Sequence, residues 1–166
     1  MEIGSIENLN DCIARGRKEA WGGISDPKPG TMLTVFDDLD EYIKENELHK
    51  ENVPQLIEHI EKSVKSTIEL LPKLKEAGVV DSGALGMFIF LEDFFYKLFE
   101  IKEDCKSIYE RFGEGLLVKS SFKDDIEKGF CVDTVLKIDG DKENIIKNIS
   151  KLGDSVVVME SNDLLK

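Results

Sequence analysis

Apolar residues recur every three or four positions through most of the first hundred residues, which is the spacing of amphipathic α-helices. The spacing predicts helices over about 5–21, from Met32 onward, over about 53–76 and over about 82–101. Pro72 is expected to bend the third helix, and Gly78 is expected to end it as its capping residue. Because the fourth helix is hydrophobic on more than one face, we expect it to be central in a bundle.

The pattern changes after residues 112–115, where β-branched residues become frequent and the helical spacing is lost. It predicts strands over 130–138 and 155–159, a helix over about 142–151 between them, and a turn into a third strand near Leu164. Such a short strand–helix–strand crossover is typical of a split βαβ, ferredoxin-like sheet, which is incomplete where the sequence stops. The predicted class is α+β, with an antiparallel helical bundle at 1–112 and a small βαβ unit at 113–166.

The charge of the chain narrows its possible partners, and its cysteines indicate the cellular compartment. The net charge is −12 and 34% of the residues are charged, so a nucleic acid or an anionic membrane surface would be repelled. Three cysteines, Cys12, Cys105 and Cys131, lie far apart, which is typical of a reducing compartment. There is no secretion signal and no apolar run of about 18 residues, so we expect a cytoplasmic protein without membrane insertion.

Two helix starts carry the candidate chemistry. The segment 29–34, Pro-Gly-Thr-Met-Leu-Thr, places a tight turn, free N–H groups and hydroxyls at a helix N-terminus, as phosphate and nucleotide sites do. An ordinary capped helix start explains the same residues and is the commoner case. Asp81 is either a carboxylate favoured by the next helix dipole or a ligand for a ribose hydroxyl or a basic partner, beside a loop that Gly83 opens to close approach. The residues alone leave both alternatives open.

The sequence context of the remaining reactive side chains favours structural roles over catalytic or metal-binding ones. His49 and His59 share no metal-ligand spacing, so surface positions are expected for both. Cys131, in the middle of a predicted strand, is more often a small buried hydrophobe than a ligand. No P-loop and no G-x-S-x-G nucleophile motif occurs in the sequence, so no catalytic residue is assigned.

Several segments, taken together and in order, resemble one family. That family is the nucleotide-binding, DhaL-like domain of the dihydroxyacetone (glycerone) kinase type, and the closest branch is the ATP-binding subunit of bacterial fatty acid kinase. The similarity covers nearly the whole chain, as the C-terminal half of that domain followed by the start of its middle domain. The segments are Pro29–Val35, Leu71–Gly86, Gly129–Thr134, Leu152–Val158 and Asp163–Lys166.

The resemblance implies a barrel of antiparallel helices, of which this chain would form a part, with ATP or ADP bound at one rim. The implied cofactor-binding residues are Gly30, Thr31 and Met32 on one wall and Asp81, Ser82 and Gly83 on the other. The implied reaction is phosphoryl transfer from ATP to a fatty acid held by a separate fatty-acid-binding protein. Cys131 would match a metal-ligand cysteine of the middle domain.

The sequence also departs from this family. The D-G-D-T-G segment that holds magnesium and a G-x-S-G phosphate loop are both absent. Without magnesium the charge of the transferring phosphoryl group is not neutralised, so we expect weak nucleotide binding and no kinase activity from this chain alone. Two alternatives are a non-catalytic interaction module built on a degenerate half-barrel, and a truncated fragment. An open half-barrel should also expose an apolar patch and self-associate.

Overall fold

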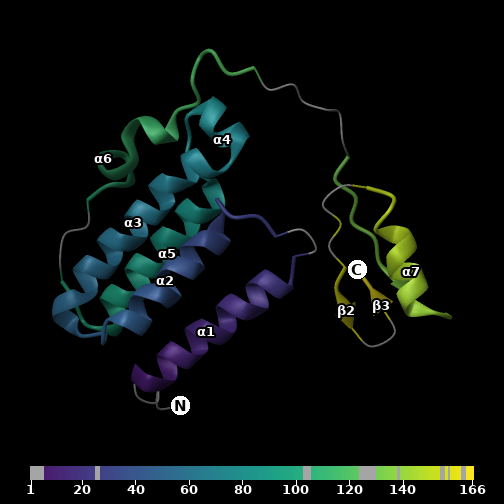
Figure 1. Ribbon diagram of the computed structural model, residues 1–166, viewed down its shortest axis with the longest axis horizontal. Coiled ribbons are helices and arrows are strands. Elements are labelled where there is room, and N and C mark those ends of the chain that lie inside the picture. Colours follow the sequence, from purple (N-terminus) through teal and green to yellow (C-terminus); the bar gives the residue numbers. More distant parts are fainter. Residues whose placement is uncertain are drawn as a thin grey trace. The chain divides into compact units, whose positions relative to one another are not determined.

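The computed structural model describes residues 6–24, 27–102, 106–123, 130–137, 139–153, 156, 158–161 and 164–166. The chain divides into two compact units, which are Met1–Trp21 with Lys28–Lys123, and Gly22–Pro27 with Asp124–Lys166. Figure 1 shows the elements of each unit, and the units are described one at a time. None of the described helices is both long and apolar enough to cross a bilayer.

The first unit is helical. Its elements are α1 (Ile6–Gly22), α2 (Met32–Glu45), η1 (Lys50–Asn52), α3 (Val53–Leu70), α4 (Pro72–Ala77), α5 (Ser82–Leu98), α6 (Ile108–Phe112) and η2 (Gly113–Leu116). Helices α2, α3 and α5 each contact the other two and lie side by side in Figure 1. Helix α3 runs antiparallel to both neighbours, so the first residues of α2 and α5 lie at the same end of the bundle as the last residues of α3 (Figure 1).

The core of this unit is formed by the apolar stripes of α2, α3 and α5. Its buried members are Val35, Leu39, Ile43, Leu48, Val53, Leu56, Ile57, Ile60, Val64, Val80, Ala84, Phe88, Leu91, Phe95 and Phe112. Each large side chain removed from water contributes about 1.5–3 kcal/mol, so these stripes hold the three helices together. Helix α5 contributes Ala84, Phe88, Leu91 and Phe95 to this core, as expected of a central helix. Ile89 and Phe90, on another face of the same helix, are exposed.

The predicted helix over 53–76 is two helices. Leu71 is extended (φ −113°, ψ 124°) and separates α3 from α4. The ring of Pro72 disfavours the helical conformation at the preceding residue, so the expected bend is a break. Gly78 ends α4 in the left-handed conformation (φ 73°), as predicted. Helix α5 ends at Leu98, three residues before the expected position.

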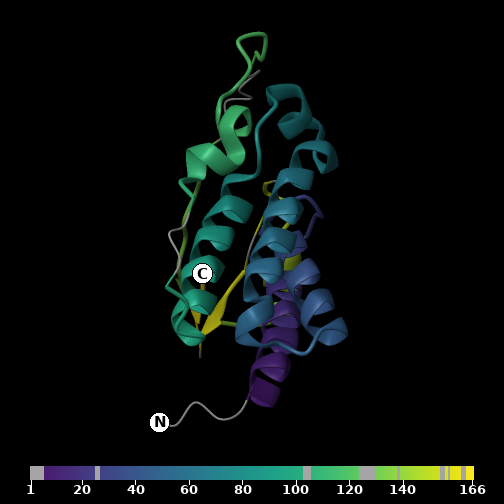
Figure 2. The same cartoon turned by 90° about the vertical axis from the view of Figure 1, so that its left-hand side faces the viewer.

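Helix α6 was not predicted. Its start is a capping box, in which the Ser107 Oγ accepts a hydrogen bond from the Glu110 N–H (3.2 Å) and the Ser107 N–H donates to Glu110 Oε2 (2.8 Å). The motif Ser-x-x-Glu is readable in a sequence and was the signal for this helix. Figure 2 shows the short helix α6 beside α5. The ring of Phe112, at the end of α6, contacts the ring of Phe88 of α5 edge to face, with centroids 5.3 Å apart.

The second unit contains β1 (Leu136–Lys137), α7 (Lys142–Ile149), β2 (Glu160–Ser161) and β3 (Leu164–Leu165). The strand order is β1-β3-β2, and β3 is antiparallel to both neighbours. Strands β1 and β2 therefore run parallel with β3 between them, which is a split strand–helix–strand arrangement. The α+β class is confirmed, whereas the partial barrel and the ferredoxin-like relationship stay predictions.

The strands are shorter than predicted. Within the predicted strand 130–138, only Leu136 and Lys137 join the sheet; residues 131–135 have no ladder partner, and residue 138 lies outside the described residues. The predicted strand 155–159 falls partly on residues 155 and 157, which are also outside the described part, and the observed pairing begins at Glu160.

Candidate functional site

Thr31 caps the first turn of α2. Its hydroxyl accepts a hydrogen bond from the Leu33 N–H at 3.3 Å and donates one to the Lys28 carbonyl at 3.1 Å. The hydroxyl of Thr34 accepts a hydrogen bond from the Gly30 N–H at 2.7 Å. Both hydroxyls of the segment therefore stabilise the turn and the cap, so a ligand at this helix start would meet backbone N–H groups and the Met32 side chain.

Gly30 fits this turn for two separate reasons. Its φ of 89° lies in the left-handed region, which residues with a Cβ rarely adopt. A Cβ at Gly30 would also lie 2.8 Å from Leu70 Cβ and 2.9 Å from Leu71 Cγ. The absence of a side chain thus lets the turn before α2 rest directly on the end of α3.

Asp81 caps α5 in the same way that Thr31 caps α2. Its Oδ2 accepts a hydrogen bond from the Ala84 N–H at 2.7 Å, so one carboxylate oxygen has the structural role. Its Oδ1 accepts no hydrogen bond from any residue that the structure describes. The amides of Ser82 and Gly83, in the first turn, have no acceptor within the helix. A carboxylate oxygen and two N–H groups are therefore available at this helix start.

Thr67 holds the Asp81 corner in place and was missed in the sequence. Its hydroxyl is buried, accepts a hydrogen bond from the Asp81 N–H at 2.9 Å and donates to the Val64 carbonyl at 2.7 Å. The signal was a hydroxyl residue on the buried stripe of α3, which is otherwise mostly apolar. This bond ties the corner before α5 to the last turn of α3.

A second support comes from the segment that follows α6. The Val80 N–H donates to the Gly115 carbonyl at 2.9 Å, and the Lys119 N–H donates to the Ala77 carbonyl at 2.8 Å. These two backbone bonds flank the corner between α4 and α5. The corner that precedes Asp81 is thus held by α3 and by the 115–119 segment.

The structure brings the two predicted walls together. A Cβ added to Gly83 would lie 3.2 Å from the Met32 Cε and 3.1 Å from Asp81 Oδ2. Met32 is 39% exposed, so its thioether side chain lies between the two helix starts and still faces solvent. Residues about fifty positions apart in sequence therefore form one surface, with Gly30 and Thr31 at one side and Asp81 and Ser82 at the other.

The other predicted candidates do not join this surface. Cys131 belongs to the second unit and is exposed with a free thiol, and Cys105 lies outside the described residues. His59 packs its ring against Tyr42 at 5.2 Å, and His49 is exposed. Among the described residues, no three His, Cys, Asp or Glu side chains group closely enough to hold a metal ion.

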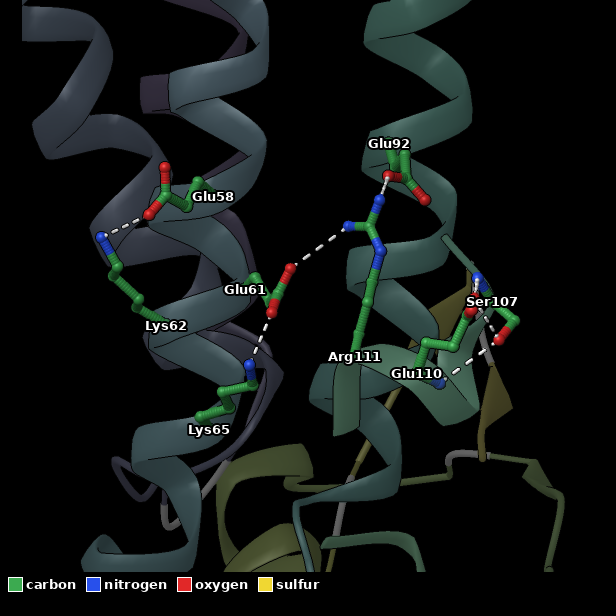
Figure 3. Close-up of polar contacts among 8 residues, drawn as sticks. All are labelled: Glu58, Glu61, Lys62, Lys65, Glu92, Ser107, Glu110 and Arg111. Atoms are coloured by element: carbon green, nitrogen blue, oxygen red, sulfur yellow. Dashed lines mark hydrogen bonds and ion pairs between the residues drawn. The ribbon is translucent and has the colours of Figure 1, made fainter. Parts of the chain in front are cut away.

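A buried ionic network links α6 to α3 and α5 (Figure 3). The Arg111 guanidinium donates to Glu92 Oε1 at 2.5 Å and lies 3.4 Å from Glu61 Oε2, and the second oxygen of Glu61 binds Lys65. Burial raises the pKa of Glu92, and the charge and hydrogen bond of Arg111 partly offset that rise. The network fixes the segment that supports the Asp81 corner.

The geometry of the two helix starts suits an anionic ligand with a flat ring. Each helix N-terminus carries a partial positive charge and unsatisfied N–H groups, which favour phosphate oxygens. A flexible thioether next to a glycine offers a flat apolar contact, and thioethers contact aromatic rings favourably. The free oxygen of Asp81 can accept a hydrogen bond from a sugar hydroxyl.

A family model identifies the type of domain, and several longer bacterial proteins are similar to the chain. The family model described as the DAK2 domain matches residues 2–95. An uncharacterized protein of Mycoplasma pneumoniae is 31% identical, and the match covers 98% of this chain and 32% of that protein. Uncharacterized proteins of two Staphylococcus aureus strains, bovine RF122 and USA300, are 27% identical, over 95% of this chain and 31% of theirs. The chain thus spans about a third of the length of these relatives.

Proposed function

Because the chain belongs to the DAK2 domain family of the dihydroxyacetone kinase type, we propose that its helical unit is a nucleotide-binding module that takes ADP or ATP. The more specific proposal is a part of the ATP-binding subunit of a fatty acid kinase. Two resemblances support it. The segments Pro29–Val35 and Leu71–Gly86 resemble the nucleotide-binding domain of that subunit, and residues 113–166 resemble the start of its middle domain. A fatty-acid-binding protein would then be the partner that presents the acyl substrate.

The observation that carries the proposal is the approach of Met32 to Gly83 between two helix N-termini. In the proposed complex the adenine ring lies on the Met32 side chain and on the backbone at Gly83. The free oxygen of Asp81 accepts a hydrogen bond from the ribose. The Ser82 amide and the positive ends of the two helix dipoles favour the negative charge of the phosphates.

The first experiment is an ADP titration followed by the amide NMR shifts of Thr31, Met32, Asp81 and Gly83. We expect a dissociation constant on the order of millimolar, because each charge-assisted bond that is missing costs about 1.5–3 kcal/mol. Affinity should be nearly insensitive to magnesium, since the sequence lacks the magnesium-binding segment. No shift at any of the four residues would contradict the proposal.

Substitution of Asp81 separates ligand binding from helix capping. Asp81→Ala should weaken ADP further and lower stability by about 1 kcal/mol, because the cap of α5 is lost. The matched control is Asp141→Ala, since Asp141 caps α7 of the second unit by accepting a hydrogen bond from the Asn144 N–H. We expect the control to remove a cap at similar cost and to leave the ADP titration unchanged. Equal effects of the two substitutions on ADP binding would contradict a direct role of Asp81.

We further propose that this chain alone does not catalyse phosphoryl transfer. The absence of the D-G-D-T-G carboxylates removes charge stabilisation worth several kcal/mol of the barrier, or many powers of ten in rate. Transfer of labelled phosphate from ATP to a fatty acid, with a fatty-acid-binding protein present, should stay at the background rate. Magnesium-dependent turnover that requires this chain would show the proposal to be wrong.

A second candidate function is a non-catalytic interaction module. The observation that favours it is the exposed apolar face of α5, on which Phe90 is 61% exposed. The two functions are compatible, because that face and the helix starts use different residues.

A further inference from the structure

The outer face of α5 is apolar and hollowed. A depression of about 820 Å³ is lined by Ile89, Phe90, Asp93, Phe94, Lys97 and Leu98, all from this helix. The rings of Phe90 and Phe94 are stacked with centroids 6.0 Å apart, so they form one continuous apolar surface. Large exposed aromatic side chains on one helix face mark a docking surface in water.

Two charges of opposite sign, neither of which is paired with another described residue, lie on the same face. Asp93 and Lys97 are four residues apart, a spacing at which an acid and a lysine on a helix can form an ion pair. Three other such pairs are formed, namely Asp40–Lys44 at 2.7 Å, Glu58–Lys62 at 2.9 Å and Glu61–Lys65 at 2.5 Å. Within the described part of the chain, neither Asp93 nor Lys97 forms an ion pair, so both charges remain available to a partner.

We propose that this face, the α5 face, binds a second copy of the chain, with the two α5 helices antiparallel around a twofold axis. When two identical helices pair in this way, a residue of one copy lies opposite the residue of the other copy for which the two residue numbers add to a constant. If the axis passes near residue 95, Asp93 of each copy lies opposite Lys97 of the other, and the two Phe94 rings meet near the axis. The exposed rings of Phe90 and Phe94 are then covered by the same rings of the other copy, and the ion pair between Asp93 and Lys97 forms twice, once on each side of the axis.

A second copy fits this face better than a partner of one charge sign. A basic segment would satisfy Asp93 and repel Lys97, and an acidic segment would do the reverse. The interface is also small: one helix face buries less than the roughly 800 Å² per partner of a standard stable interface. We therefore expect a weak dimer with a dissociation constant on the order of 100 μM.

The test is sedimentation equilibrium of the full chain at about 0.15 M salt, where charges beyond about 8 Å are screened. The wild-type chain should form dimers as concentration rises. Asp93→Lys and Lys97→Asp should each weaken the homodimer by about tenfold or more, because both cross-pairs become repulsive. An equimolar mixture of the two variants should recover association, since the Asp93→Lys chain then places two positive charges opposite the two negative charges of the Lys97→Asp chain.

The double variant Asp93→Lys with Lys97→Asp exchanges the two charges and should restore the homodimer. This variant also controls for folding, since both positions line the outer face of α5 and circular dichroism should be unchanged. The single variants move the net charge in opposite directions, so a general charge effect would strengthen one and weaken the other. A wild-type monomer up to about 1 mM, well above the midpoint expected for weak pairing, would overturn the proposal. Association that ignores the charge reversals, or a mixture that fails to associate, would also overturn it.

Discussion

Replacing Arg111 by methionine is expected to lower the free energy of unfolding of the helical unit by about 3–5 kcal/mol, because removing one member of a buried ion pair leaves the other charge uncompensated. The Arg111 side chain is 8% exposed, and its partner Glu92 is similarly buried. Arg111 also lies over the ring of Phe88, at 5.2 Å from its centroid, so packing is lost together with charge. Urea unfolding followed by circular dichroism measures the change.

The double variant Arg111→Met with Glu92→Met identifies the cause. A buried ion pair replaced by apolar side chains of similar size is often neutral or even stabilising, so stability should return to within about 1 kcal/mol of wild type. Arg15→Met is the matched control, since Arg15 lies on an exposed part of α1, and it should change stability by less than about 0.5 kcal/mol. If Arg111→Met is no worse than this control, the network does not hold α6.

The pair formed by Glu92 and Arg111 should also make the stability of the helical unit depend on pH. The pKa of Glu92 is raised by burial and lowered in part by Arg111, so the folded state binds this proton more tightly than the unfolded chain does. The stability that Glu92 contributes is therefore greatest below its unfolded pKa of about 4.3 and declines as the pH rises through its folded pKa. Arg111→Met removes the offsetting charge, so its loss of stability should be larger at pH 7 than at pH 4. An equal loss at both pH values would contradict this assignment.

Gly30→Ala is expected to lower stability by about 2–4 kcal/mol, from left-handed backbone strain and a forced contact with the end of α3. The added Cβ would meet Leu70 Cβ at 2.8 Å and Leu71 Cγ at 2.9 Å, and neither atom is the end of a flexible side chain. Relief of this contact moves the start of α2, so Met32 should move away from Gly83. The amide shift of Gly83 on ADP addition should therefore shrink together with the thermal midpoint.

Gly16→Ala makes the same chemical change at a site without either constraint. Gly16 lies within α1 and has nothing within 4 Å of an added Cβ. Alanine forms helix better than glycine by about 1 kcal/mol, so this substitution should leave stability unchanged or raise it. Destabilisation by Gly16→Ala equal to that by Gly30→Ala would show that general packing, and not the turn, determines the loss.

Local chemistry made much of the helical unit predictable. Thr31 and Asp81 are caps whose type and position can be read directly, and the structure places a helix start immediately after each. The approach of Met32 to Gly83 is a tertiary property, because the intervening fifty residues must first fold back. It was expected from the family resemblance, and no spacing in the sequence encodes it.

The missed features depend on partners that are distant in sequence. In the sequence, Thr67 is only a polar residue within an apolar stripe. Its role follows from the Asp81 amide, fourteen residues later, which donates a hydrogen bond to its hydroxyl. Arg111 looks like a surface charge, and its burial follows only when α6 packs beside Glu92 and Glu61. In the second unit, Val132 and Val135 have strand-forming side chains but are exposed, so β-propensity alone did not produce a ladder there.

The bond between the Asp81 amide and the Thr67 hydroxyl has a kinetic consequence. Thr67 is fully buried, so the Asp81 amide proton can exchange with solvent hydrogen only when the corner between α4 and α5 opens. The amides of Ser82 and Gly83, which have no acceptor within their helix, exchange from the closed state as well. The hydrogen-exchange rate of the Asp81 amide therefore reports how often the corner opens. A ligand that binds the closed corner should lower this exchange rate.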